Sequence, residues 1–442
     1  MIKKEILKQA TEFNVHYVRL MFTDINGILK NVEIPVSGLE SALEGEVMFD
    51  GSSIQGFVRI QEADMYLQPD LSTWLLLAYE DTSYGTVARL ICDVYTMDRK
   101  PFAEDPRYIL KKTLAKMESM GFSAFQIGVE PEFFLYKTEG DTILLEPSDD
   151  GGYFDLAPVD QAEDCRRDIV LELEALGFMV EAAHHEVAEG QNEINFRFAN
   201  ALAAADNLQQ FKLVVKNVAR RHGLHATFMA KPVYGINGSG MHTNCSLTDA
   251  NGVNAFFHEE DSMKLSPVCR QFIAGVLKQA PGFTAICNPT VNSYKRLVPG
   301  YEAPVYVSWS DANRSALIRI PAKRGSATRI ELRSVDATAN PYLAFSAILA
   351  SGLYGIEHQL VPMDPVYANL YAMNREEREA QGIDQLPENL KEALYALKKN
   401  ELLNEVIGKP LLTKFMELKY QEWDEYRTQV TEWELNSYLK QY

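Results

Sequence analysis

The segment Gln126-Ile127-Gly128-Val129-Glu130-Pro131-Glu132-Phe133 alternates between apolar residues and residues that can bind charge. Successive side chains of a β-strand point to opposite faces of the sheet. Glu130 and Glu132 therefore share one face of the predicted strand, and Ile127, Val129 and Phe133 share the other. The pattern predicts a strand with one apolar face and one face that carries paired carboxylates.

Three other segments show the same alternation. They are Glu193-Ile194-Asn195-Phe196-Arg197, His242-Thr243-Asn244-Cys245-Ser246 and Arg329-Ile330-Glu331-Leu332-Arg333. A solvated sheet surface would favour Lys, Thr and Ser, whereas these faces offer carboxylates, an imidazole and guanidinium groups. Such groups can hold metal ions and a phosphorylated anion. We therefore predict that the four strands form the floor of a catalytic site.

Composition restricts the class of protein. A chain of 442 residues is long enough for two or three domains with a substantial core. Hydrophobic residues make up 46% and charged residues 24%, which is typical of a globular protein in water. The net charge of −18 argues against a surface that binds nucleic acid or an anionic membrane directly.

Cysteine usage and apolar runs predict a cytoplasmic location. The five cysteines are odd in number and form no CxxC pair, which argues against a disulfide framework or a zinc knuckle. Residues 1–7 form a short amphipathic start with an early acid, unlike a signal peptide. The longest apolar stretch, residues 74–79, is too short to span a bilayer.

The chain divides into two predicted domains, residues 1–102 and residues 103–442. In the first, a helix is expected at 2–13, and Asn26-Gly27 is a hairpin signal between strands at 16–23 and 28–34, with further strands at 74–78 and 87–95. The polar segment 98–106 reads as a linker, and Pro106 opens a helix. The second domain alternates strands with helices near residues 106–120, 160–176, 200–221, 263–279 and 341–357, and is helical at 386–440.

The acidic residues favour a metal centre. Glu130 and Glu132 would repel each other on one strand face, and a divalent cation would turn that repulsion into binding energy. Two Mg2+ or Mn2+ ions could be held by the mainly oxygen ligands Glu130, Glu132, Glu186, Glu193, His242 and Glu331. For any single one of these groups, a solvated, salt-bridged or structural role is the more common outcome. The shared facing of four strands favours the metal centre.

Glycines and arginines extend the interpretation. The loop Asn237-Gly238-Ser239-Gly240 leads into a strand, so it is neither a Walker A loop nor a dinucleotide fingerprint. It is either an ordinary turn or a place where backbone approaches an amino-acid substrate closely. The arginine cluster comprises Arg296, Arg314, Arg319, Arg329 and Arg333. Two metals and these arginines, without a P-loop, indicate phosphoryl transfer organised by charge.

In this order the motifs are specific, and from about residue 12 the chain resembles a type I glutamine synthetase. The matching motifs are Phe49-Asp-Gly-Ser-Ser-Ile, Glu130-Pro-Glu-Phe, Gly152-Tyr153, His184-His-Glu, Gly190-Gln-Asn-Glu193, Asn237-Gly-Ser-Gly-Met-His242, Arg329-Ile-Glu-Leu-Arg333 and Ala339-Asn-Pro-Tyr-Leu. The resemblance implies an α+β fold, with a small N-terminal β-grasp-like domain and a large catalytic domain whose curved antiparallel sheet is flanked by helices. It implies ATP-dependent condensation of L-glutamate with ammonia through γ-glutamyl phosphate.

The resemblance also implies roles for individual residues. One metal would lie on Glu132, Glu186 and Glu193, and the other on Glu130, His242 and Glu331. Glutamate would contact Asn237, Gly238, Arg296 and Arg333. The nucleotide would contact Glu181, Asn244, Ser246, Arg319 and Arg329, and Arg314 would steady the transferring phosphoryl group. Ammonium would be bound and deprotonated by Asp50, Ser53 and Tyr153, and Glu302 would sit on a flap that closes over the intermediate.

Assembly is a further implication. In the family, the N-terminal domain of one subunit completes its neighbour's active site, so Asp50 would act in trans. Six such sites close a ring, and two rings form a dodecamer. The aromatic C-terminal segment would dock on the opposite ring through Trp423, Trp433 and Tyr438, although a plain amphipathic helix packed on its own domain is the simpler alternative.

Departures from the family pattern predict the subtype. An insertion that the longer subtype carries between the acids matching Glu132 and Glu186 is missing, and Tyr371 lacks the context of adenylylation, so we expect it to be unmodified. The chain resembles the shorter, Gram-positive subtype. In that subtype an arginine matching Arg59 is linked to glutamine feedback, and the enzyme binds nitrogen-regulatory transcription factors. A lysine often found near the nucleotide is replaced around Ser326.

Three rival functions are weaker. A ligase that joins glutamate to a larger amine would not need an intact Asp50, Ser53 and Tyr153. A non-catalytic scaffold or nitrogen sensor is expected to lose metal ligands, and all six candidates are present. A glycosidase that uses two acids would have no use for the arginine cluster.

Overall fold

The structure is a computed structural model that describes residues 1–54, 64–82 and 85–442 of the chain. Side chains are described outside residues 78–82. Arg59, the residue to which the sequence assigns a feedback role, lies outside the described residues.

The N-terminal domain is built on a five-stranded sheet with the order β2-β1-β5-β4-β3. Its elements are α1 (Lys3–Glu12), β1 (Val15–Thr23), β2 (Leu29–Pro35), α2 (Leu39–Leu43), β3 (Val47–Asp50), β4 (Asp64–Thr82) and β5 (Gly85–Tyr95). The β1–β2 pair is an antiparallel hairpin, as Asn26-Gly27 predicted, and Gly27 adopts a φ of 78° in its turn. The β1–β5 pair is parallel.

The larger domain contains a ten-stranded sheet whose main path is β13-β14-β15-β12-β6-β9-β8. Its strands are β6 (Phe122–Glu139), β7 (Thr142–Pro147), β8 (Val180–His185), β9 (Gln191–Phe196), β10 (Ala199–Asn200), β11 (Leu224–Thr227), β12 (Met241–Asp249), β13 (Tyr306–Ser310), β14 (Ala316–Arg319) and β15 (Ile330–Leu332). The long strand β6 also pairs with β7, β10 and β11. The recorded pairs of this sheet are antiparallel except β13 with β14, so its predicted antiparallel character holds with one exception.

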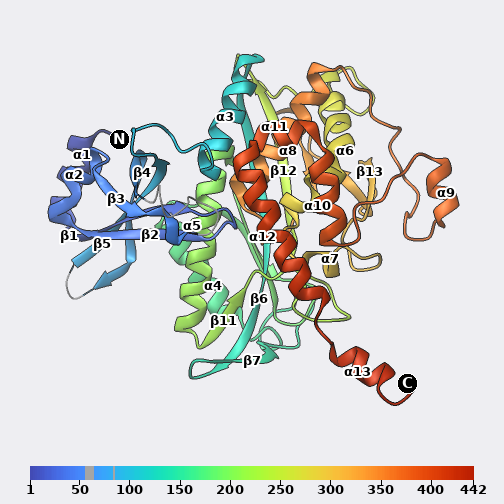
Figure 1. Cartoon of the computed structure of the whole chain (residues 1–442), viewed down its shortest axis with the longest axis horizontal. Helices are drawn as coiled ribbons and strands as arrows, with labels where there is room; N and C mark the ends of the chain where they lie inside the picture. Colours follow the sequence, from blue (N-terminus) through green and yellow to red (C-terminus); the bar gives the residue numbers. More distant parts are fainter. Residues whose placement is uncertain (55–63, 83–84) are drawn as a thin grey trace.

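Helices pack around this sheet (Figure 1). They are α3 (Pro106–Ser119), α4 (Glu163–Ala175), α5 (Ala201–Arg221), α6 (Pro267–Cys287), α7 (Ser293–Arg296), α8 (Pro341–Glu357), α9 (Arg375–Ala380), α10 (Leu390–Lys399), α11 (Glu401–Ile407), α12 (Lys409–Arg427) and α13 (Glu432–Tyr438). Apolar residues of β6, α5, α6 and α8 form one buried core, which includes Ile127, Val129 and Phe133. The apolar face predicted for β6 is therefore the face that packs on the helices.

One predicted helix has the wrong bounds. The sequence indicated a helix at 263–279, and α6 runs instead from Pro267 to Cys287. The Ser266 hydroxyl accepts a hydrogen bond from the Cys269 backbone N–H and so caps the first turn. The helix continues through Pro281 because its second half is buried in the core, and such tertiary packing overrides local propensity.

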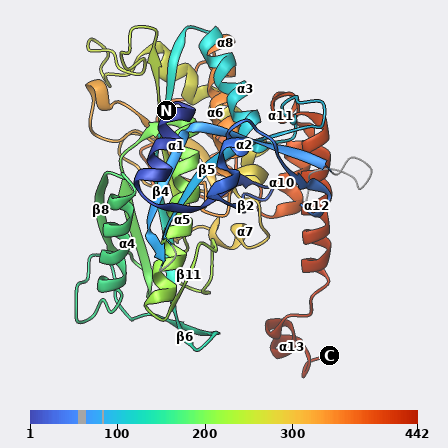
Figure 2. The same ribbon diagram turned by 90° about the vertical axis from the view of Figure 1, so that its left-hand side faces the viewer.

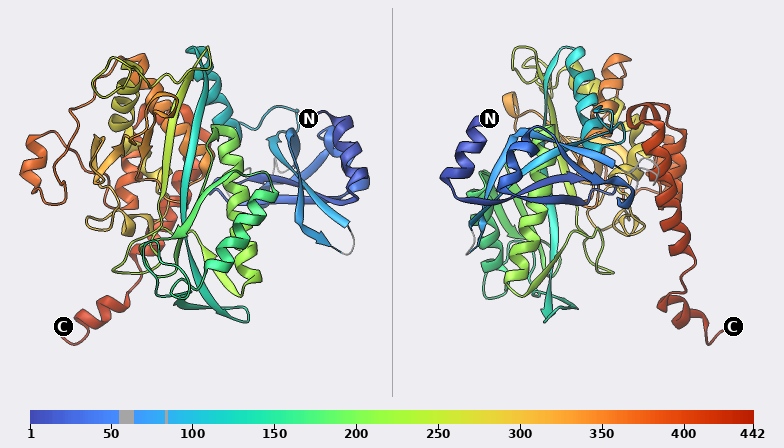
Figure 3. Two further views of the ribbon diagram at one scale, coloured as in Figure 1. Left: turned by 180° about the vertical axis from the view of Figure 1, so that it is seen from behind. Right: turned by 60° about the vertical axis from the view of Figure 1, so that its left-hand side comes forward.

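The N-terminal domain sits against the larger domain, as the turned views show (Figures 2 and 3). At this junction the buried Arg107 of α3 donates hydrogen bonds to Asp70 of β4 and Asp93 of β5, both at 2.7 Å, and to Asp206 of α5. The Asn340 amide donates to the Asp24 carbonyl at 3.0 Å. Charge and backbone contacts therefore fix the position of the small domain.

The C-terminal end of the chain projects from the body. Helix α13 lies beyond α12 and extends away from the rest of the molecule (Figure 1). Trp433 and Tyr438 on α13 are exposed, whereas Trp423 on α12 packs partly against the main core. Among the described residues, no helix has the length and apolar character needed to cross a membrane.

Candidate active site

Strand register brings the predicted ligands together. Across the β6–β12 pair, Glu130 lies opposite His242. Across β12–β15, Asn244 lies opposite Glu331, and across β14–β15, Arg319 lies opposite Glu331. Directly opposed side chains of adjacent strands lie on the same face of the sheet. Antiparallel pairing therefore places groups from distant parts of the sequence on one face.

The first ligand group consists of Glu130, His242 and Glu331. One potential ligand atom from each lies within 4.8 Å of the others. His242 Nδ1 is 3.5 Å from a Glu130 carboxylate oxygen and 3.8 Å from a Glu331 carboxylate oxygen. Glu331 is fully buried, accepts a hydrogen bond from Arg333 at 2.6 Å and pairs with Arg319. These three residues are the set that the sequence assigned to one metal.

The second ligand group contains a residue to which the sequence interpretation gave no role. His184, Glu186 and Glu193 offer ligand atoms within 4.8 Å of one another. Glu132 lies opposite Glu193 across the β6–β9 pair, and Glu193 lies opposite His184 across β8–β9. One Glu132 carboxylate oxygen accepts hydrogen bonds from the Gly240 backbone N–H and the Gln191 amide, both at 2.8 Å. The structure thus adds His184 beside the predicted set and holds Glu132 by neutral donors.

The electrostatics of the second group fit a divalent cation. Burial and the nearby Glu132 and Glu193 carboxylates raise the pKa of Glu186 to about 9. Burial also raises the pKa of Glu132. Carboxylates this close and this buried resist ionising together unless a cation neutralises them. Oxygen-rich donors with one imidazole suit Mg2+ or Mn2+.

The glycine loop before β12 packs tightly on its own surroundings. A Cβ on Gly240 would lie 2.6 Å from Arg296 Nη2 and 3.3 Å from a Glu132 carboxylate oxygen. A Cβ on Gly238 would overlap the Ala230 carbonyl. Both glycines are therefore needed for packing within the protein. The sequence had suggested a different reason for them, the close approach of an amino-acid substrate to the backbone. Asn237 is half-buried in the same loop.

Two buried arginines lie behind this loop. Arg296 donates hydrogen bonds to the Ser334 carbonyl at 2.7 Å and to the Arg333 carbonyl at 3.0 Å. Arg296 therefore holds the backbone that follows β15. Arg333 Nε is buried and has no hydrogen-bond partner among the described residues. An unpaired buried donor of this kind is unusual in a native structure, and its charge suits an anionic partner.

A cavity of about 480 Å³ lies beside Glu130, on the side of the sheet formed by β6, β8 and β12. Its size is within the range of small-molecule sites. It is lined by four of the predicted nucleotide contacts, Glu181, Asn244, Ser246 and Arg329, and also by Ser326. Arg329 donates to Asn244 at 2.8 Å, and Asn244 donates to Glu130 at 3.0 Å. The cavity therefore connects directly to the first ligand group.

Among the residues that line this cavity and that sequence reasoning did not assign to the site are Phe198 and Lys323. Phe198 lies directly before β10 and is an exposed aromatic residue. Its exposure beside the cavity could be seen only in the structure, so no sequence pattern pointed to it. Lys323 lies three positions before Ser326, where the family's lysine was noted as replaced. Arg319 does not line the cavity and instead pairs with Glu331.

Three further predicted residues lie around the second ligand group. Carboxylates of Glu186, Glu193 and Glu302 contribute, after burial, to a raised pKa of Tyr153, and Arg314 lowers it. Glu302 also contributes to the raised pKa of Glu186. Tyr153 and His184 contact each other edge to face, with ring centroids 5.7 Å apart. Tyr153, Glu302 and Arg314 therefore share one neighbourhood with the second ligand group.

Asp50 and Ser53 are not part of this neighbourhood within one chain. Asp50 ends β3 in the N-terminal domain and accepts hydrogen bonds from the Ser52 backbone N–H at 2.8 Å and the Ser52 hydroxyl at 2.6 Å. Both Asp50 and Ser53 are exposed. In the described part of the chain, no recorded contact links either residue to the ligand groups.

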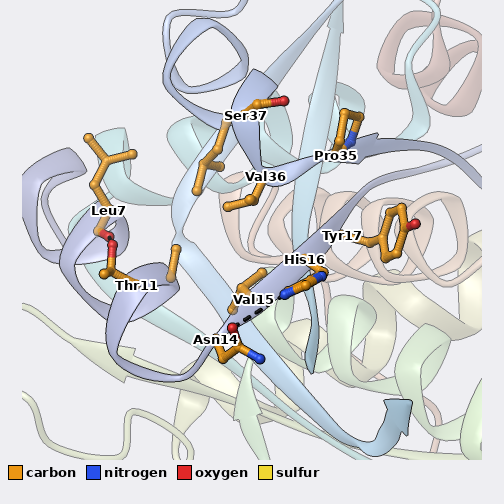
Figure 4. Close-up of a pocket in the computed structure, with 11 residues that line it drawn as sticks. Leu7, Thr11, Asn14, Val15, His16, Tyr17, Pro35, Val36 and Ser37 are labelled. Carbon is orange, nitrogen blue, oxygen red and sulfur yellow. Dashed lines mark hydrogen bonds between the residues drawn. The ribbon is translucent and has the colours of Figure 1, made fainter. Parts of the chain in front are cut away.

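The N-terminal domain has a cavity of its own. It measures about 620 Å³ and lies between α1, β1 and residues 35–39 (Figure 4). Apolar side chains such as Leu7 and Val36 line it, together with His16, which is hydrogen-bonded to Asn14 at 3.3 Å. None of the predicted site residues lines this cavity.

Comparison with known proteins identifies the family. The model of the glutamine synthetase catalytic domain matches residues 103–438, and that of the glutamine synthetase β-grasp domain matches residues 14–97. The chain belongs to the glutamine synthetase family. The predicted resemblance and the α+β fold with an N-terminal β-grasp domain are thereby confirmed.

Relatives match over the full length. Glutamine synthetases of Staphylococcus aureus strain MRSA252 and of Staphylococcus epidermidis are each 59% identical over 441 residues, covering 100% of this chain and 98% of theirs. A solved structure of a GmaS/ADP complex has a TM-score of 0.89 at 34% identity, covering 98% of this chain and 99% of that chain. The Plasmodium falciparum glutamine synthetase has a TM-score of 0.89 at 25% identity, covering 99% of each chain. The family is one of ATP-dependent ligases.

Proposed function

We propose that the chain is a glutamate–ammonia ligase of the cytoplasm. It joins ammonia to L-glutamate at the expense of ATP and yields L-glutamine, ADP and phosphate through γ-glutamyl phosphate. The observation that carries this proposal is the pair of ligand groups on one sheet face, adjacent to a cavity of nucleotide size. The full-length identity of 59% to glutamine synthetases supports the same reaction.

Two divalent cations, Mg2+ or Mn2+, would supply charge neutralisation for the phosphates and for glutamate when bound. Glu130, His242 and Glu331 would hold one of them. Glu132, Glu186 and Glu193 would hold the other, with His184 as an additional neighbour. The raised pKa values of Glu132 and Glu186 support a cation at the second group.

Glutamate would lie beside the glycine loop, within reach of Arg333. The unpartnered Arg333 Nε suits a carboxylate, because a guanidinium binds carboxylates by paired hydrogen bonds. Arg296 would act mainly through the backbone that it holds, and Asn237 and Gly238 would border the amino acid. Phosphoryl transfer would be steadied by Arg314, near Tyr153 and the second ligand group.

The nucleotide would occupy the cavity beside Glu130. Glu181, Asn244, Ser246 and Arg329 line it, and Lys323 adds a cation that faces the same space. Arg319 would act from the metal side, where it pairs with Glu331. Charged and amide groups of this kind can orient the phosphates for in-line attack by the glutamate carboxylate.

Ammonium would bind near Tyr153 and would be deprotonated by Asp50 with help from Ser53. The exposure of Asp50 and its separation from the ligand groups support a site completed by a neighbouring subunit. We propose the assembly of the family, a dodecamer of two hexameric rings with active sites between subunits. The exposed Trp433 and Tyr438 on the projecting α13 support a contact between rings.

Regulation is proposed along the lines of the shorter subtype. Arg59 would carry glutamine feedback, and Arg59→Ala is expected to weaken glutamine inhibition of the ligase. A nitrogen-regulatory transcription factor would bind the assembled enzyme, which size-exclusion chromatography of a mixture would detect.

Tyr371 would carry no AMP, and mass spectrometry of the cellular protein would test this. Its half-buried position and its hydrogen-bonded hydroxyl support that prediction.

The experiment that tests the reaction is phosphate release from ATP with glutamate, with and without ammonium. Ammonium should stimulate release by the wild type, and Glu132→Ala should lower the stimulated rate by about a hundredfold or more. Glu118→Ala, an exposed glutamate on α3, is the matched control and should retain the wild-type rate. Absence of ammonium stimulation in the wild type would refute the proposal. A preference for larger amines over ammonium would favour the amine-ligase alternative.

A further inference from the structure

The loop formed by residues 298–304 joins α7 to β13 and carries Glu302. Glu302 is exposed and has a φ of 57°, a left-handed conformation that residues other than glycine rarely adopt. Such a conformation persists only where surrounding contacts over-determine it. The loop lies beside the glycine loop, because Lys231 contacts both Tyr301 and the Ile236 carbonyl, and the Gly240 N–H of the glycine loop donates to Glu132.

A buried lysine contacts the residue before Glu302. The Lys231 ammonium lies 4.0 Å from the centroid of the Tyr301 ring, within the range of a cation–π interaction. The same ammonium donates to the Ile236 carbonyl, directly before Asn237 and Gly238. The Lys231 backbone is itself fixed, since its N–H donates to the Asn292 side chain at 2.8 Å and its carbonyl accepts from that side chain at 2.9 Å. Lys231 thus connects the glycine loop with the 298–304 loop.

A tyrosine contacts the residue after Glu302. The Tyr371 hydroxyl donates a hydrogen bond of 2.8 Å to the Ala303 carbonyl. Burial raises the pKa of Tyr371, so the hydroxyl keeps its proton and remains a donor at neutral pH. Its ring lies 6.3 Å from that of Tyr306, at the start of β13. Glu302 is therefore flanked by two residues that are each held by a contact from a different part of the chain.

We propose that Lys231 and Tyr371 are positioning residues that hold the 298–304 loop over the active site and thereby limit the access of water to γ-glutamyl phosphate. This inference rests on the proposed ligase reaction and adds two residues to it. Through Lys231, the position of the 298–304 loop depends on the glycine loop, beside which glutamate would bind. Tyr371 holds the opposite end of the same short segment.

Loss of this positioning has a defined chemical consequence. Water that reaches γ-glutamyl phosphate adds to its acyl carbon or to phosphorus, breaks the acyl–phosphate linkage and returns glutamate and phosphate. One ATP is then converted to ADP and phosphate without formation of glutamine. A well-held loop gives one phosphate per glutamine, and a loosened loop raises the ratio of phosphate to glutamine.

The test measures both products in the assembled, full-length enzyme with glutamate, ATP, Mg2+ and subsaturating ammonium. Tyr371→Phe removes only the hydroxyl, and Lys231→Met removes the ammonium while it keeps a long side chain. Each is expected to raise the phosphate-to-glutamine ratio by about threefold to tenfold, the effect of one lost polar contact on a loop equilibrium. Lys231→Arg should restore part of the coupling. The controls Tyr395→Phe and Lys278→Met alter exposed residues elsewhere and should leave the ratio at the wild-type value.

The outcomes separate this inference from the function on which it rests. A wild type without ammonium-stimulated phosphate release refutes the ligase itself. An active wild type, together with an unchanged ratio in Tyr371→Phe and Lys231→Met, overturns the positioning role. An equal loss of both products also overturns it, because that result indicates general structural support. If Lys231→Met does not fold, Tyr371→Phe decides the question alone, because it removes one oxygen atom.

Discussion

At the scale of residues, burial sets the chemistry of the site. Glu132 is held by neutral donors, from Gly240 and Gln191, while Glu186 is surrounded by other carboxylates. The first arrangement fixes the orientation of a carboxylate without neutralising it. The second arrangement raises the pKa of Glu186 to about 9. This carboxyl group therefore needs a nearby cation to ionise at neutral pH. His184 adds an imidazole 3.7 Å from both Glu186 and Glu193.

The prediction at this scale concerns His184. His184→Ala should weaken the binding of Mn2+ to the second ligand group by about tenfold to a hundredfold, the usual effect of removing a ligand or the group that orients it. Isothermal titration calorimetry on the nucleotide-free enzyme measures this affinity. His258→Ala, a change at an exposed histidine, is the control. Equal Mn2+ affinities of wild type and His184→Ala would remove His184 from the site.

At the scale of elements, register is the organising feature. The pairs Glu130–His242, Asn244–Glu331 and Glu132–Glu193 follow from how β6, β12, β15 and β9 align. A shift of one residue in any of these strands would turn its ligands to the apolar face. The large apolar core under β6 therefore also fixes the positions of the two ligand groups, because it determines which face of each strand is buried.

The glycine loop provides the prediction for elements. Gly240→Ala places a methyl group 2.6 Å from Arg296 Nη2, so Arg296 must move and loosen the backbone next to Arg333. We expect the KM for glutamate to rise by about tenfold or more, with a smaller change in the KM for ATP. Steady-state kinetics measures both constants. Gly38→Ala, where a Cβ meets only ordinary contacts, should change neither. An unchanged glutamate KM in Gly240→Ala would show that Arg296 does not position the glutamate site.

At the scale of the whole molecule, the two domains are joined by charge as well as by apolar packing. Arg107 binds acids from β4, β5 and α5, and its removal would take the cation from Asp70 and Asp206, whereas Asp93 would keep its ion pair with Lys111. The small domain is thereby held in place, and in the described part of the chain no recorded contact joins the exposed Asp50 to the ligand groups. This placement is what makes a site between subunits physically reasonable.

A mixing experiment tests that assembly. Asp50→Ala and Glu132→Ala should each be nearly inactive alone. If Asp50 serves the neighbouring subunit, random co-assembly of the two variants in equal amounts restores native pairs at about a quarter of the sites. Ligase activity of co-expressed, doubly tagged oligomers measures this recovery. Sites built within a single chain would show no recovery, because every chain carries one defect.

The sequence by itself determined the four alternating strands with their apolar and charged faces, the hairpin at Asn26-Gly27 and the family, but not strands such as β3, β7, β13 and β14. These features depend on local periodicity and on ordered motifs, which any reader of the chain can detect. Only the tertiary structure decided that His184 lies beside Glu186 and Glu193, that Gln191 donates to Glu132, that Gly240 makes room for Arg296, and that Lys231 and Tyr371 contact the loop around Glu302. Apart from those of His184, these contacts join residues that are far apart in the chain, and no local pattern encodes which distant side chains will meet when the core packs.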